Sequence, residues 1–220
     1  MQKQIYTLVV DFSIQGDLAY LSHQETLKMF QRGLVRASVP LAFSMGFNPH
    51  PRLSIPFPRS VGAQSQQDRL CAVIESSEES CERDEILQIQ SQLPEGCTIL
   101  DVQKLEGKCI FYPQGVRYTF HMGSPFDVQF REHLVHCQQQ VQEKREINIQ
   151  RYWAKKKRYK TFDMSPCLKE LSFTDNQINA VCVVSESGSV RVDELMQWLN
   201  ITLEELAQPV NRTEICWSQN

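Results

Sequence analysis

The sequence lacks any apolar stretch that approaches the roughly 20 residues needed for a membrane-spanning helix. Its first residues, MQKQIYTLVVDF, also lack the longer apolar core and small-residue cleavage site of a secretory signal. The composition, 41% hydrophobic and 22% charged, is that of an ordinary globular protein. We therefore expect a cytoplasmic protein that makes no membrane contact.

Paired cysteine motifs are also missing. Eight cysteines are scattered along the chain without a CxxC pair or a CxxxCxxC cluster, which argues against zinc-ribbon and iron-sulfur sites and favours reduced thiols. The nearest approach to a metal site is His133, His136 and Cys137, whose spacing places them along one helix face. Such side chains often meet on a polar helix without a function, and we predict no metal in this chain.

The motifs of the common enzyme classes are absent. The sequence contains no Gly-rich phosphate loop, no nucleophile elbow and no HExxH helix. Binding is therefore expected more than catalysis.

The net charge of -3 hides an uneven distribution. Residues 144–160, KREINIQRYWAKKKRYK, hold eight Lys or Arg against one acidic residue. Because cations neutralise phosphates and aromatic rings stack on unpaired bases, this mixture is typical of a surface that binds single-stranded or looped RNA. The alternative is a solvated charged loop. The candidate contacts are Arg151, Tyr152, Trp153, Lys155, Lys156, Lys157, Arg158, Tyr159 and Lys160.

A second basic surface is predicted on the first helix. Ser22 followed by Glu25 is a capping-box pattern, so a helix is expected over residues 23–37. Its Lys28, Arg32 and Arg36 recur every four residues and form a basic stripe. These three cations are further candidates for polyanion binding.

The segment that follows this helix, GFNPHPR at 46–52, contains two prolines and a glycine and is predicted to be a rigid loop. Asn48, His50 and Arg52 supply polar groups for a polyanion. Phe47, Pro49, Pro51 and Phe57 could instead anchor a protein partner. A third interpretation is a tight connector between strands.

Periodicity predicts two α/β (α+β) halves. In residues 1–105 the order strand, helix, strand, strand, helix, strand is that of a ferredoxin-like βαββαβ domain with a mostly antiparallel sheet. The predicted elements are a strand at 5–12, a helix at 23–37, two extended pieces at 41–44 and 53–57 on either side of the rigid loop, a strand at 70–75, a helix at 83–92 and a strand at 98–102. Residues 116–220 repeat this order more loosely, with the basic aromatic segment 151–160 inside. The elements predicted there are 116–122, 126–141, 147–153, 179–184, 189–200 and 213–217.

The first 60 residues contain a set of motifs that a known family shares. They are Phe12, Gly16, Leu18, Tyr20-Leu21-Ser22-His23, Phe30-Gln31-Arg32, Pro40-Leu41-Ala42-Phe43-Ser44, Gly46-Phe47-Asn48-Pro49-His50-Pro51 and Leu53-Ser54. On these residues the chain resembles an uncharacterised family known as radical SAM-linked proteins. Fainter matches are Phe162-Asp163-Met164, Gly188-Ser189-Val190-Arg191 and Arg212-Thr213.

The resemblance implies a partner rather than a reaction. Members of that family are fused behind a radical SAM enzyme or encoded beside one, and this chain resembles the free-standing form. The resemblance therefore implies an accessory or substrate-recognition module, with the iron-sulfur cluster and S-adenosylmethionine in the partner and no cofactor in this chain. Its neighbours include ribosomal and ribonuclease functions, which makes tRNA or rRNA the expected ligand.

An enzymatic alternative depends on His23. A histidine in the first turn of the first helix of a ferredoxin-like domain is similar to that of CRISPR RNA-processing endonucleases, which cleave RNA without a metal. Imidazole both accepts and donates protons near neutral pH, and His50 would supply the partner if the loop folded over the helix. The competing hypothesis is that His23 only ties the helix start to the loop.

Overall fold

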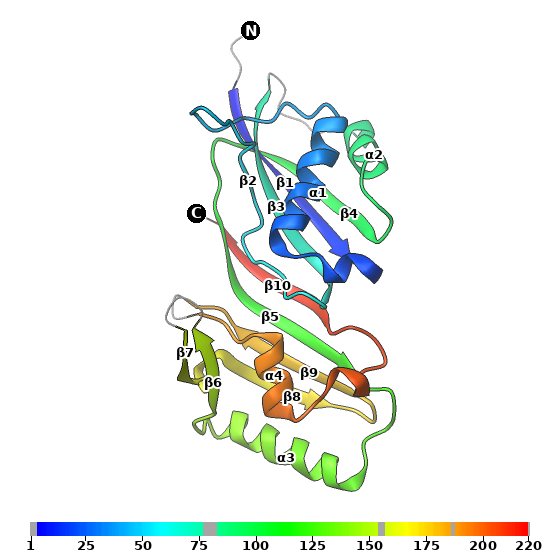
Figure 1. Cartoon of the computed structure of the whole chain (residues 1–220), viewed down its shortest axis with the longest axis vertical. Coiled ribbons are helices and arrows are strands. Elements are labelled where there is room, and N and C mark those ends of the chain that lie inside the picture. Colours follow the sequence, from blue (N-terminus) through cyan, green and yellow to red (C-terminus); the bar gives the residue numbers. More distant parts are fainter. Residues whose placement is uncertain (1–3, 77–82, 154–156, 186–187, 220) are drawn as a thin grey trace. The chain divides into compact units, whose positions relative to one another are not determined.

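A computed structural model describes residues 4–76, 83–153, 157–185 and 188–219 (Figure 1). The chain forms two compact units, Met1–Pro113 with Trp217–Asn220 and Gln114–Cys216. The division falls between the two predicted halves, although the last residues group with the first unit. The fold is mixed α+β with mostly antiparallel strands, which confirms the predicted class. Within the part of the chain that is described, no helix is both long and apolar enough to span a bilayer.

The first unit alternates strands and helices. Its elements are β1 (Gln4–Ile14), the 3-10 helix η1 (Gly16–Tyr20), α1 (His23–Arg36), β2 (Leu53–Ser54), β3 (Gln64–Ser76), α2 (Arg83–Ser91) and β4 (Cys97–Glu106). In the sheet, β1 lies between β4 and β3, β2 pairs with β3, and these three pairings are antiparallel. The structure confirms the predicted helices to within a residue or two, but β1, β3 and β4 are longer than predicted and the expected strand at 41–44 contains only isolated bridges.

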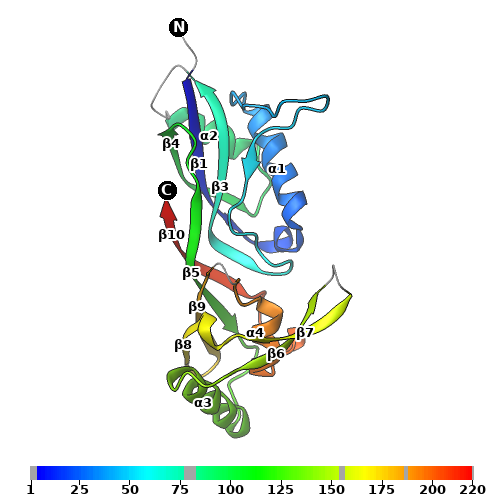
Figure 2. The same cartoon turned by 90° about the vertical axis from the view of Figure 1, so that its left-hand side faces the viewer.

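The core of the first unit follows from strand alternation. Leu8, Val10 and Phe12 point to the face of the sheet that the helices cover, because alternate side chains of a strand lie on one face. They pack against Phe30 of α1, whose ring centroid lies 4.5 Å from that of Phe12, and against Ile89 of α2. Both helices therefore cover the same face (Figures 1 and 2).

The start of α1 is fixed by two sets of hydrogen bonds. The Glu25 amide donates to Ser22 Oγ at 3.3 Å and the Ser22 amide donates to the Glu25 carboxylate at 2.8 Å, which confirms the predicted capping box. Just before this cap, buried Arg59 donates to the carbonyl oxygens of Ala19 at 2.7 Å and Ala63 at 2.6 Å. The guanidinium thus ties η1 to the segment that leads into β3.

The second unit contains most of β5 (Phe111–His121) and of β10 (Asn211–Gln219), whose residues 111–113 and 217–219 belong to the first unit. Between these two strands in the chain are α3 (Val128–Gln142), β6 (Asn148–Trp153), β7 (Arg158–Asp163), the 3-10 helix η3 (Ser165–Cys167), β8 (Leu168–Phe173), β9 (Gln177–Val183), α4 (Val192–Leu199) and the 3-10 helix η4 (Leu203–Glu205). The strand order is β10-β5-β9-β8, and β6 and β7 form a separate two-stranded hairpin.

Two strands of this unit were not predicted. β7, RYKTFD, is charged and exposed over most of its length, and β8, LKELSF, has only two buried positions. Because a strand is predicted from alternating apolar residues, neither segment stands out. The basic aromatic segment is therefore largely part of a hairpin instead of an irregular loop.

Candidate functional site

The β6–β7 hairpin is attached to the second unit through its base. Arg151 of β6 donates to both carboxylate oxygens of Glu194 in α4, with Nη2 at 2.7 Å from Oε2, and to the carbonyl oxygen of Ser189 at 3.0 Å. Its guanidinium carbon also lies 3.6 Å from the ring centroid of Phe162 in β7. This arginine is therefore occupied inside the protein, and the structure does not support its predicted contact with a polyanion.

Asp163 closes the same base. Its carboxylate accepts hydrogen bonds from the amides of Ile147 and Ser165 and from the Ser165 hydroxyl, each at 3.0 Å. Partial burial raises the pKa of Asp163, but these hydrogen bonds outweigh that effect and the net pKa is lowered. The carboxylate is thus charged at neutral pH and joins the residue before β6 to the residues after β7.

The outer part of the hairpin exposes two tyrosines. Tyr152 and Tyr159 are directly opposite each other across the strands, with ring centroids 5.2 Å apart and an interplanar angle of 56°. Their exposed fractions are 48% and 68%. A pair of exposed aromatic rings on a projecting hairpin is a surface on which unpaired bases can stack.

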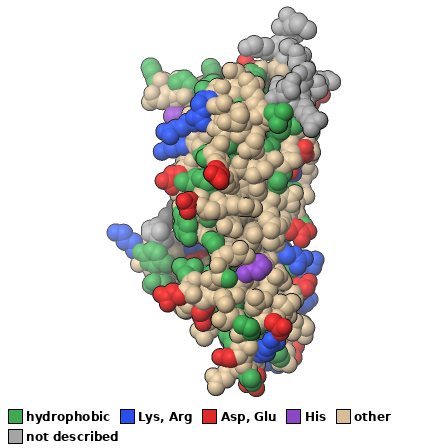
Figure 3. Space-filling model, turned by 90° about the vertical axis from the view of Figure 1, so that its right-hand side faces the viewer, with side chains coloured by type: hydrophobic (Ala, Val, Ile, Leu, Met, Phe, Trp, Pro, Cys, Tyr) green, Lys and Arg blue, Asp and Glu red, His purple; other side chains and the backbone are tan. Residues whose placement is uncertain are grey.

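The hairpin that carries this tyrosine pair also exposes cations. Because alternate residues face opposite sides of a strand, Arg158 and Lys160 lie on the other face from Tyr159. Lys157 precedes them with a positive φ of 47°, and all three residues are exposed. Figure 3 shows hydrophobic and Lys or Arg side chains together on the projecting hairpin. Lys155, Lys156 and the Trp153 side chain lie outside the described residues.

The predicted basic stripe on α1 is present. Lys28 and Arg32 are exposed, and together with Arg36 they border a cavity of about 720 Å³ between α1 and the segment after α2. Arg36 Nε donates to the Gln92 side-chain oxygen at 3.1 Å, and Nη2 donates to the Gln92 carbonyl. Arg36 therefore joins α1 to the segment just after α2, which leaves Lys28 and Arg32 as the cations of the stripe for which no such bond is shown.

The GFNPHPR segment forms a narrow loop between two paired ends. Phe43 and Pro51 form an isolated antiparallel bridge, and the Ser44 amide donates to the His50 carbonyl at 2.8 Å. Gly46 has a φ of 132°, which only glycine adopts readily. Asn48, His50 and Arg52 are all exposed. Its apolar tip is exposed as well, Met45 at 93% and Phe47 at 106%.

The two histidines of the enzymatic hypothesis do not meet. His23 begins α1 beside the start of β3, whereas the loop that carries His50 is anchored near the other end of β3, where Ala42 N donates to Val73 O at 2.8 Å. The 14 residues of α1 span roughly 21 Å between these ends. Figures 1 and 2 both show the loop near the last turn of α1. An acid–base pair of His23 and His50 is therefore not assembled in this structure.

The cysteines and histidines do not form a metal centre in the described residues. No group of three or more His, Cys, Asp or Glu side chains there is arranged to hold a metal ion. Cys137 is buried, and its Sγ lies 3.5 Å from His133 Nε2. Burial raises the pKa of Cys137 to about 11, so this thiol is protonated and is not a ready metal ligand.

The sequence patterns missed several residues that organise these surfaces. Glu194 and Asp163 hold the hairpin base, and Arg59 holds the start of α1. The structural roles of these three residues come from tertiary contacts. Sequence periodicity could not reveal them, because isolated carboxylates and a lone arginine form no periodic pattern. Glu194 has a second role at the start of α4, where its carboxylate accepts a hydrogen bond from the Arg191 amide at 2.8 Å.

Comparison with protein families shows what the chain is similar to. The model of a family described as "Uncharacterized protein conserved in bacteria (DUF2344)" matches residues 7–192. No curated protein matches the chain.

Proposed function

Because the chain belongs to the DUF2344 family of uncharacterised bacterial proteins, whose description assigns no activity, we propose a function from the geometry: binding of single-stranded or looped RNA through the β6–β7 hairpin. The observation that carries this proposal is the exposed pair Tyr152 and Tyr159 on one face of a hairpin that also exposes the cations Lys157, Arg158 and Lys160. A tRNA or rRNA loop has the required unpaired bases.

Exposure of the tyrosines supports stacking. The two rings contact each other, and their remaining surface is open to solvent. Stacking of a base on such a ring is worth about 1–3 kcal/mol. The hairpin base is fixed by Arg151 and Asp163, so the rings are held in place before a ligand binds. A held surface loses less conformational entropy on binding.

The cations support attraction of phosphates to the hairpin, with Arg158 and Lys160 on the face opposite the tyrosines. Three Lys or Arg residues that neutralise phosphates of a single strand give a slope of log K against log salt of about -2. Lys28 and Arg32 of α1 offer a second basic surface in the other unit, and we include them as secondary RNA contacts.

The first test is binding of a labelled unpaired RNA oligonucleotide by fluorescence anisotropy over a range of salt concentrations. The proposal predicts the slope given above and much weaker binding of an RNA duplex of equal length, because paired bases cannot stack on the tyrosines. A Lys169→Ala protein is the control, since Lys169 is an exposed cation of β8 in the same unit. Binding that is independent of salt, or equal for duplex and single strand, contradicts the proposal.

We also propose that both units are ferredoxin-like. In the first unit the order β4-β1-β3-β2 supports this assignment. In the second unit the order β10-β5-β9-β8 supports it once β6 and β7 are treated as an insertion between α3 and β8. On this interpretation the RNA-binding hairpin is an addition to the second half. An experimental structure that shows different crossovers would contradict it.

We further propose that the protein serves as an accessory module to a radical SAM enzyme, which would hold the iron-sulfur cluster and S-adenosylmethionine. An exposed apolar tip at Met45 and Phe47 supports docking to a protein, because isolated aromatic side chains that enter a partner's pocket are typical binding anchors. Co-purification with a radical SAM protein after nuclease treatment and at high salt tests this role. The Phe47→Ala protein should lose the partner, and the exposed Val61→Ala protein should keep it.

A further inference from the structure

A cavity of about 590 Å³ lies in the first unit, on the face of the sheet opposite α1 and α2. Thr7 of β1 and Cys71 of β3 line it, and they alternate with residues that face the helices. Residues 108–113, between β4 and the first part of β5, form one wall, and β2 forms the other. The volume is within the range typical of small-molecule sites.

The cavity is positively charged. Lys108 lies on one wall and Arg52 on the other, and the lining residues, all of them described, include no Asp or Glu. Asp11, on the same face of β1, is paired with Arg69 through two hydrogen bonds of 2.7 Å. The carboxylate of that strand is therefore neutralised, and an anion would meet the two cations first.

The backbone that carries Lys108 is held in place. Buried Thr7 donates its hydroxyl to the Gly107 carbonyl at 2.8 Å and accepts from the Cys109 amide at 2.9 Å. Lys108 thus sits between two residues that are both bonded to β1. Gly107 has a φ of 74°, which favours glycine at this turn.

The backbone that carries Arg52 is held in a similar way. The Arg52 amide donates to the Ala42 carbonyl at 2.9 Å, and the Val73 amide donates to the Arg52 carbonyl at 2.9 Å. Both cations are therefore attached to hydrogen-bonded backbone, which fixes the point from which each side chain extends.

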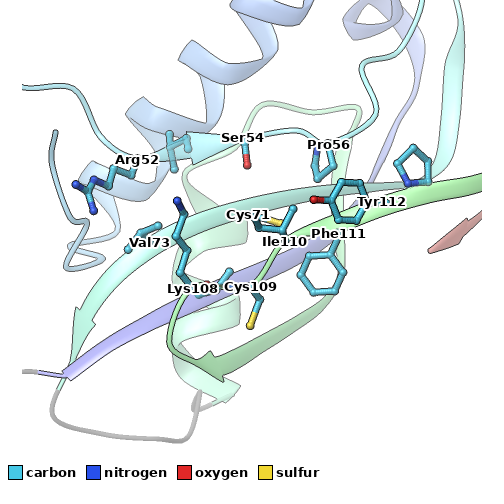
Figure 4. A pocket seen from close by; sticks show the side chains of 13 residues that line it. Arg52, Ser54, Pro56, Cys71, Val73, Lys108, Cys109, Ile110, Phe111 and Tyr112 are labelled. Carbon is cyan, nitrogen blue, oxygen red and sulfur yellow. Dashed lines mark hydrogen bonds between the residues drawn. The ribbon is translucent and has the colours of Figure 1, made fainter. Parts of the chain in front are cut away.

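Hydroxyls and apolar side chains complete the site. Figure 4 shows the hydroxyls of Ser54 and Tyr112 and the amine of Lys108 pointing into the cavity from its two walls. Cys71 and Phe111 provide an apolar floor, and the Tyr112 ring is 45% exposed. Burial raises the pKa of the Cys71 thiol to about 11, so at neutral pH it carries no charge that would repel an anion.

We propose that this cavity binds a small phosphate ester, with Lys108 and Arg52 on the phosphate and the organic group against Phe111 and Tyr112. Arginine and lysine are the usual phosphate-binding side chains, and an aromatic wall suits a ring or a base. The site is independent of the proposed RNA-binding hairpin, because its residues belong to the first unit and those of the hairpin to the second.

Equilibrium dialysis with the full chain tests this site. Adenosine 5′-monophosphate and ribose 5-phosphate represent a nucleotide and a sugar phosphate, and adenosine and inorganic phosphate lack one half of the ligand. At least one of the two esters should bind tenfold or more tightly than adenosine and than inorganic phosphate. Lys108→Ala should weaken that binding by at least about tenfold, as expected for loss of a charged hydrogen bond.

Two further variants make the result specific. Ser54→Trp fills the cavity without removing a charge and should abolish ester binding, whereas Lys169→Ala removes an exposed cation outside the cavity and should leave ester binding unchanged. Lys108→Ala should not alter RNA binding by the hairpin. Failure of the phosphate-ester proposal can therefore be distinguished from failure of the RNA-binding proposal. Failure of both esters to bind at millimolar concentration, or equal binding by wild type and Lys108→Ala, overturns this site.

Discussion

Arg151 and Glu194 join the β6–β7 hairpin to α4 through a pair of hydrogen bonds between guanidinium and carboxylate. The Glu194 side chain is 5% exposed and that of Arg151 is 20% exposed, so the pair is largely withdrawn from water. The hairpin base is consequently fixed while its outer tyrosines face solvent. This arrangement separates the residues that hold the hairpin from those proposed to bind RNA.

Replacing Glu194 with Gln should destabilise the second unit. The change leaves the Arg151 guanidinium without its counter-charge, and breaking a buried pair costs about 3–5 kcal/mol, so for this partly exposed pair we expect about 2–4 kcal/mol. Urea unfolding measures the difference. Glu214→Gln is the matched control, because Glu214 pairs with Arg117 at 3.3 Å on the exposed surface and should cost about 1 kcal/mol or less. Equal effects of the two changes would contradict this role for Glu194.

Asp163 should make stability depend on pH in the acid range. Although burial raises its pKa, the three hydrogen bonds lower the net value, so the folded state favours the charged form. Its contribution is complete above the unfolded pKa of about 3.9 and is lost as the pH falls through the lower folded value. Thermal unfolding at several pH values should show a weaker acid dependence for Asp163→Asn than for wild type. Glu170→Gln, an exposed change on β8, serves as control, and an identical acid dependence in all three proteins would rule out this effect.

The capping residues of α1 show what local sequence can predict. The Ser22 and Glu25 pattern gave the helix start correctly, because a capping box involves only neighbouring residues. The α+β class and the order of elements in the first unit also followed from periodicity. In the second unit, β7 and β8 were missed because they have too few buried apolar positions to give an alternating pattern. Their place in the fold depends on partners far along the chain.

The candidate site was less predictable than the fold. Composition located the basic aromatic segment, but it treated Arg151 as equivalent to Arg158, although one is bound to Glu194 and the other is exposed. Lys108 gave no sequence signal, because its importance comes from the cavity that two distant segments enclose. The spacing of His23 and His50 likewise could not show that they lie at opposite ends of α1.

Loss of the cap should weaken α1 measurably. Ser22→Ala removes the acceptor for the Glu25 amide and should cost about 0.5–2 kcal/mol. The hydrogen bonds with Ser22 also lower the pKa of Glu25, so wild type should lose this stabilisation as the pH falls through that lowered value. Urea unfolding at neutral and acidic pH measures both effects. Ser124→Ala, in an exposed loop, should change neither, and a Ser22→Ala protein as stable as wild type at neutral pH would disprove the cap's contribution.

The tyrosine pair provides the most direct test of RNA binding. In the Tyr152→Ala, Tyr159→Ala double variant, anisotropy with an unpaired RNA oligonucleotide should show a loss of roughly 1–3 kcal/mol per stacked base. The salt slope should stay near that of wild type, because Lys157, Arg158 and Lys160 remain. Unchanged affinity of this double variant, in a protein that retains its folded stability, would contradict the account that the hairpin is an RNA-binding surface.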